Sequence, residues 1–178
     1  MSTITTEQAI LSGTWTLDAV HSSVGYAVRH GGVSLFKGTV DSFDVEFVDG
    51  KLSGTADVSS ITVNDENLQG HLLGPDFFDV ERTPRVSFES RSTSRVGDEL
   101  TVEGELEIRG VEQPVTLTGT IAGPVEGPAG ERIGITLETV IDRTTFGITW
   151  NMELPGGGFI LDNEVTLIAN LEFGKAQG

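Results

Sequence analysis

Residues 71–79, His-Leu-Leu-Gly-Pro-Asp-Phe-Phe-Asp, bring three ionisable side chains next to two adjacent phenylalanines. Pro75 lacks a backbone N–H and disfavours a helical residue before it, so we expect a short helix over Asp65 to Leu73 that ends there. His71 near the end of this helix could hydrogen-bond a ligand or transfer a proton. The two aromatic rings can cover an apolar site. We therefore expect this segment at the functional end of the molecule.

The other two histidines suggest binding rather than catalysis. Alternation along the strand places His30 on the apolar side with Tyr26 and Val28, directly before two glycines. Two interpretations stay open for it: a hydrogen-bonded core histidine, or a contact for a polar head group at the mouth of a cavity. His21 precedes Ser22, but adjacent strand residues point to opposite faces and a Gly-x-Ser-x-Gly elbow is missing. We therefore expect no catalytic residues.

Metal and thiol chemistry are disfavoured as well. The three histidines lie in separate blocks without a spacing such as His-x-x-x-His, and the chain has no cysteine. We therefore expect no metal site, no cofactor and no disulfide. Arg143 follows Asp142 and could simply pair with it, or it could contact a head group.

Length and charge limit the partners. A chain of 178 residues suits a single domain with a substantial core. A formal net charge of −16 repels nucleic acid and anionic bilayer surfaces at long range, although such acidity also serves solubility alone. No window is long and apolar enough to span a membrane. Residues 1–11 lack lysine, arginine and an apolar run, so we expect no secretory signal and a cytoplasmic location.

Alternating apolar and polar residues from Trp15 onward predict half-buried β-strands. Residues 100–108 are the clearest case, with apolar side chains on one face and polar ones on the other. At least eight such strands must either stack as a sandwich or close into a barrel, and the period alone leaves both open. The turn signals between them, which suit hairpins of an antiparallel sheet, are Asp49-Gly50, Gly97-Asp98 and residues 123–130.

Several blocks resemble a known family in order and spacing. They are residues 71–79, 106–117 and 141–147, with Trp15 to Asp18, His21-Ser22, Val28 to His30 and Asp162 to Val165. Spread over residues 13–173, they resemble the YceI family. The resemblance implies an all-β fold, an antiparallel eight-stranded, extended lipocalin-like β-barrel with one or two short helices, whose apolar interior holds a polyisoprenoid tail. It also implies a binding protein, not an enzyme.

The expected domain covers residues 13–174, with an N-terminal extension or short helix over 1–12 and a tail over 175–178. The second short helix would span Thr6 to Leu11, where Thr5 and Gln8 could form a capping box. Small residues on the apolar face leave room for a guest in a barrel of this size, although glycines there also mark bulges. These small residues are Gly54, Ala56, Gly104, Gly119 and Ala169.

The side chains expected to bind the ligand are selected by their position on the apolar face of a strand together with the resemblance. They are Val24, Tyr26, Val28, His30, Phe36, Leu72, Phe77, Phe78, Phe88, Leu106, Leu117, Leu137, Phe146 and Trp150. The expected head-group contacts are His30, His71 and Arg143.

We expect the guest to be a polyisoprenoid or isoprenoid quinone-type lipid that the protein binds, carries or sequesters. Two alternatives stay open. One is an enzyme that acts on a lipid or small ligand inside the barrel, with His30 or His71 as general base. The other is a protein-interaction or stress module with a solid core. A homodimer is also left open.

Overall fold

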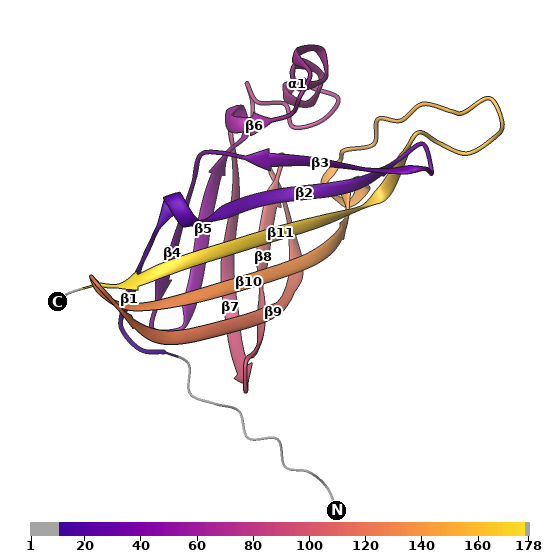
Figure 1. Cartoon of the computed structure of the whole chain (residues 1–178). Coiled ribbons are helices and arrows are strands. Elements are labelled where there is room, and N and C mark those ends of the chain that lie inside the picture. Colours follow the sequence, from indigo (N-terminus) through magenta and orange to yellow (C-terminus); the bar gives the residue numbers. More distant parts are fainter. Residues whose placement is uncertain (1–10, 177–178) are drawn as a thin grey trace, which may run out of the picture.

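The computed structural model describes residues 11–176 and shows a closed antiparallel β-barrel of eight strands (Figure 1). The all-β barrel expected from the sequence is therefore confirmed. The short helix expected over residues 6–11 lies outside the described residues except for Leu11, which is not helical.

The elements follow one another as a series of hairpins with one α-helical insertion. The strands are β1 (Thr14–Leu17), β2 (Ser23–His30), β3 (Ser34–Val40), β4 (Phe43–Val48), β5 (Lys51–Asp57), β6 (Ile61–Thr62), β7 (Arg85–Val96), β8 (Glu99–Ile108), β9 (Val111–Gly127), β10 (Gly130–Asp142) and β11 (Leu161–Lys175). The helices are α1 (Glu66–Leu73) and the 3-10 turns η1 (Ala19–His21), η2 (Val58–Ser60) and η3 (Arg143–Phe146).

Strand pairing closes the barrel. Neighbours follow the order β1-β4-β5-β7-β8-β9-β10-β11, and β1 then pairs with β11. Three of the eight barrel strands are interrupted. β1 continues as β2 after η1, β3 continues as β4, and β5 continues as β6 after η2. Because β11 pairs with β1 at its end and with β2 through residues 161–170, the β2–β3 hairpin extends the wall to one side.

Two tight turns show why the strands reverse where the sequence predicts. Asp49 and Gly50, between β4 and β5, have φ values of 49° and 81°. Two consecutive positive φ values are what a two-residue hairpin turn with the twist of its strands requires. Gly97, between β7 and β8, has φ of 60°. The predicted hairpins at both positions are confirmed.

Buried side chains form two clusters inside the barrel. Trp15, Phe47 and Phe173 are at most 2% exposed and anchor the first cluster, at the β1 end. The second cluster contains Phe77 and Phe146 and lies towards α1. The predicted apolar face of β8 is confirmed, because all four of its members are buried: Leu100, Val102, Leu106 and Ile108.

The α1 segment covers one end of the barrel. The Asp65 carboxylate accepts a hydrogen bond from the Leu68 amide at 2.9 Å, which satisfies one free N–H of the first helical turn. The helix ends at Leu73, before Gly74 and the proline, as predicted. The chain then folds back, since the Phe78 amide donates to the Leu72 carbonyl at 3.0 Å. Within residues 11–176, none of the helices has the length and apolar character to cross a membrane.

Candidate functional site

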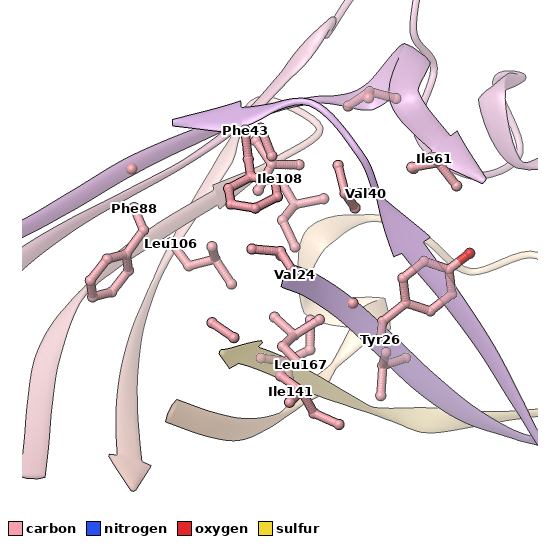
Figure 2. Close-up of a pocket in the computed structure, with 18 of the residues that line it drawn as sticks. Val24, Tyr26, Val40, Phe43, Ile61, Phe88, Leu106, Ile108, Ile141 and Leu167 are labelled. Atoms are coloured by element: carbon pink, nitrogen blue, oxygen red, sulfur yellow. The ribbon is translucent and has the colours of Figure 1, made fainter. Parts of the chain in front are cut away.

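An apolar cavity of about 280 Å³ lies between the two core clusters. This volume is close to the lower end of the roughly 300–1,000 Å³ found for small-molecule pockets. Phe88 contacts both clusters and marks the boundary between them. Figure 2 shows Val24, Leu106, Ile141 and Leu167 pointing towards one another from different strands around this space.

Three of the five small residues on the apolar face line this cavity, and the other two pack closely against neighbouring atoms. Gly54, Ala56 and Ala169 line the cavity, as their inward parity predicts. Gly104 instead makes room for the ring of Phe88, whose nearest atoms lie 2.7–2.9 Å from where a Cβ of residue 104 would stand. Gly119 lies against the backbone of β10. Close packing against neighbouring atoms, and not room for a guest, therefore explains two of the five small residues.

Most of the side chains predicted to bind the ligand lie together on the cavity wall. They are Val24, Tyr26, Val28, Phe36, Leu72, Phe77, Phe78, Phe88, Leu106, Leu117 and Leu137. Their convergence from six strands and α1 gives the predicted set one common location. Their contact with a ligand stays a prediction.

Three predicted residues lie elsewhere. His30 has the same parity as Val28, but it pairs with Ser34 at the exposed end of the β2–β3 hairpin. The expectation that it faces the apolar interior is wrong because the hairpin extends beyond that interior. Phe146 is 1% exposed within the second cluster, where η3 turns inward, and Trp150 packs against the same cluster.

His71 joins the α1 segment to the chain that follows η3. Its ring makes edge contacts with Phe77 and Trp150, at centroid distances of 4.9 and 4.7 Å, and these two rings lie 5.5 Å apart. Its Nε2 lies 3.2 Å from a carboxylate oxygen of Asp76. We call residues 66–80 the lid, because Leu72, Phe77 and Phe78 within it line the cavity. His71 is not among the lining residues. Its position therefore suits holding the lid against Trp150 rather than contacting a head group.

Arg143 is the one charged side chain among the described residues that line the cavity. It is 4% exposed, and its guanidinium donates to the carbonyls of Asp162, Ile148 and Trp150 at 2.8–2.9 Å. No carboxylate of residues 11–176 lies within 4 Å of it. Burial lowers the pKa of Arg143, and the nearby Asp142 charge opposes this effect.

Nη2 of Arg143 has only a long contact, 3.5 Å, with the amide oxygen of Asn163. A guanidinium carries five N–H donors, so at least one donor on Nη2 has no protein partner among the described residues. Arg143 therefore both holds the segment after η3 in place and keeps donor capacity beside the cavity.

Tyr26 contributes its ring to the cavity wall. Its hydroxyl oxygen is the one buried side-chain polar atom of the described chain without a hydrogen-bond partner. In Figure 2 this oxygen points away from Leu167 and Ile141. Burial raises the pKa of Tyr26 to about 12, because the phenolate would lose its hydration.

Sequence reasoning missed several lining side chains. Phe43, Val45, Val86, Val165 and Leu167 all line the cavity and follow the same two-residue period as the predicted residues. The two-residue period alone would have been enough to predict that these side chains face the cavity. Ile148 and Leu161 flank an irregular segment, where alternation gives no direction, so only the folded structure places them.

One polar cluster lies outside the cavity. Ligand atoms of Asp18, His21 and Glu172 lie within 4.8 Å of one another. Arg132 already contacts both carboxylates, at 3.0 and 3.2 Å. Asp18 also caps η1 by accepting from two backbone amides. The arrangement is an ionic network that fastens η1 to β10 and β11.

Comparisons with known proteins agree with this architecture. A family model described as a YceI-like domain matches residues 15–173. A UPF0312 protein of Staphylococcus aureus (strain N315) is 31% identical over 170 residues, which cover 89% of this chain and 96% of that protein.

Two solved structures share the fold. BcnA of Burkholderia cenocepacia has a TM-score of 0.73 at 23% identity, over 88% of this chain and 98% of BcnA. A polyisoprenoid-binding domain of Saccharophagus degradans, implicated in plant cell wall breakdown, has a TM-score of 0.65 at 13% identity, over 93% of this chain and 100% of that domain.

Proposed function

The chain belongs to the YceI-like family, and from this membership and the cavity we propose that it binds and carries a long isoprenoid-type lipid. The lipid tail occupies the apolar space between the two core clusters. The observation that carries the proposal is an interior cavity walled almost entirely by aliphatic and aromatic side chains. The polyisoprenoid-binding domain of Saccharophagus degradans supports the same class of guest.

The tail sets the affinity in this proposal. Burial of apolar surface contributes about 0.8 kcal/mol per methylene, so each five-carbon unit contributes roughly 3–4 kcal/mol gross. A neutral hydrogen bond to the head contributes about 0.5–1.5 kcal/mol, and one to a charged group up to about 3 kcal/mol. The head group therefore sets orientation more than affinity.

Arg143 is the cavity residue best suited to the head group. It is the buried cation beside the apolar space, it has donor capacity left on Nη2, and it has no carboxylate partner among residues 11–176. A quinone carbonyl or a phosphate oxygen could accept from it. The head then lies at the end of the cavity near η3 and the lid.

The cavity volume limits how much tail fits. A space of about 280 Å³ accommodates a small guest without rearrangement. A longer tail needs the lid or the side chains at the boundary, such as Phe88, to move. We therefore expect affinity to rise over the first isoprene units and then to level off.

The geometry favours this function over the two alternatives. Neither of the histidines suggested as a general base, His30 and His71, lines the cavity. A solid-core module is disfavoured because the interior contains a cavity instead of a continuous core.

A displacement assay with isoprenoids of increasing length tests the proposal. Ala169→Leu fills part of the cavity, whereas Ala122→Leu adds the same bulk at an exposed position on β9. We expect the first variant to lose roughly tenfold or more in affinity for longer tails, since about two methylenes of burial are lost. The second should bind as wild type does. Equal, weak binding of all lengths by all three proteins would contradict the proposal.

A further inference from the structure

Two neighbouring hairpins at one end of the barrel carry exposed apolar side chains. At the β2–β3 turn, Val33 is 85% exposed and Leu35 is 50% exposed. On the segment between η3 and β11, Met152 is 52% exposed and Phe159 is 58% exposed. Large apolar side chains that gather at a projecting edge suggest a contact surface more than isolated ones do.

The two hairpins form one continuous projection. The Gly31 amide donates to the Ile160 carbonyl at 2.7 Å, and the Ile160 amide donates to the Met152 carbonyl at 2.9 Å. Glu153 and Phe159 form an isolated β-bridge within the second hairpin. Figure 1 shows both hairpins projecting from the same end of the barrel. We call their exposed apolar residues the tip patch: Val33, Leu35, Met152 and Phe159.

Charge on the β2–β3 side of the tip patch differs from that of the whole chain, whereas the second hairpin carries the exposed Glu153 beside Met152. Residues 19–40 contain no aspartate or glutamate, although the protein has a net charge of −16. Arg29 and Lys37 are exposed on this stretch, and within residues 11–176 neither forms an ion pair. Arg29 stands directly opposite Leu35 in the hairpin ladder. Repulsion by distant carboxylates is screened beyond about 8 Å at physiological ionic strength.

The cavity wall reaches almost to this projection. Val28 and Phe36 are paired across the β2–β3 ladder and both line the cavity, and Leu161, the partner of His30, lines it as well. The β2–β3 hairpin thus presents one face to the cavity and carries Val33 and Leu35 of the tip patch at its end.

We propose that the tip patch docks on a phospholipid bilayer. The four apolar side chains insert at the level where head groups meet acyl chains, and Arg29 and Lys37 lie among the lipid phosphates. Docking places the cavity beside the membrane from which a lipid guest would come. That purpose rests on the proposed function, whereas docking itself does not.

Flotation with phosphatidylcholine vesicles tests the proposal. The variant Val33→Asp/Phe159→Asp places two charges in the tip patch. The control Val20→Asp/Val125→Asp adds the same charges at two exposed valines outside it. All four side chains are exposed, so folding should be retained and is checked by circular dichroism.

We expect the wild type and the control to float with the vesicles, and the tip variant to lose roughly tenfold or more in partitioning, since apolar burial is replaced by charge. Arg29→Gln/Lys37→Gln should reduce partitioning by several fold. A wild type that does not float, or a tip variant that floats equally well, would overturn the proposal. Isoprenoid binding without vesicles is measured on the same proteins: a wild type that floats but binds no isoprenoid contradicts the proposed function and leaves docking intact.

Discussion

Tyr26 and Gly38 face each other across the β2–β3 ladder, and the tyrosine ring occupies the space where a side chain at position 38 would stand. An ideal Cβ on Gly38 would lie 2.8 Å from Cε1 of the ring and still closer to the hydroxyl oxygen. The glycine therefore allows the only tyrosine of the chain to lie flat against the wall of the cavity.

Gly38→Ala should displace the Tyr26 ring and destabilise the protein by about 1–3 kcal/mol, as other overpacked interiors do. Gly134→Ala is the matched control, since an added Cβ there meets no atom within 4 Å. Urea unfolding monitored by circular dichroism gives both values. Equal stability of the two variants would show that the Tyr26 ring moves aside without any loss in the free energy of unfolding.

The Tyr26 hydroxyl should ionise only at high pH. Its raised pKa of about 12, against about 10 in an unfolded chain, means that the folded state keeps the proton more tightly. This contribution to stability is complete below pH 10 and is lost as the pH rises towards 12. Tyrosinate absorbance during an alkaline titration measures the pKa of Tyr26 directly, with Tyr26→Phe as the blank. A native midpoint near 10 would contradict the buried position.

The two lid phenylalanines should respond differently to a buried charge. Phe77 is 7% exposed and contacts His71 and Trp150, so Phe77→Asp should cost several kcal/mol of stability. Phe78 is only half-buried and lines the cavity, so Phe78→Asp should weaken lipid binding more than folding.

Thermal melts beside isoprenoid-binding assays separate these effects. Phe78→Leu serves as the control and should retain both stability and binding. If Phe78→Asp lowers the melting temperature as much as Phe77→Asp does and leaves binding intact at a permissive temperature, the lid does not belong to the site.

Sequence periodicity predicted the barrel wall well because the strands alternate regularly. The buried face of β8 and the end of α1 at Leu73 both follow from local rules. His30 was misplaced because parity gives the face of a strand but not how far the apolar interior extends along it. The contacts of Arg143 with Ile148 and Trp150 depend on an irregular segment, and no local pattern predicts them.

The ionic network around η1 predicts a specific pH dependence. Hydrogen bonding to His21 lowers the pKa of Asp18 to about 2, and the same bond raises the pKa of His21. The Asp18 contribution to stability is therefore present above about pH 4 and is lost as the pH falls towards 2. The His21 contribution is present below pH 6.5 and is lost as the pH rises through its raised pKa.

NMR titration of the His21 ring should give a midpoint above 6.5. Asp18→Asn should return this midpoint towards the ordinary value, whereas Asp44→Asn, at an exposed position on β4, should not change it. An unchanged midpoint in Asp18→Asn would show that the bond does not set the proton affinity of the ring.

Native mass spectrometry and solvent extraction of gently purified protein show whether the barrel holds a lipid tail. We expect an adduct near one molecule per chain, and an extract whose mass corresponds to an isoprenoid-type lipid. Ala169→Leu should carry less of it, and Ala122→Leu should carry as much as the wild type. Protein without an adduct, together with no uptake of added isoprenoids of any length, would show that the barrel does not hold a lipid tail.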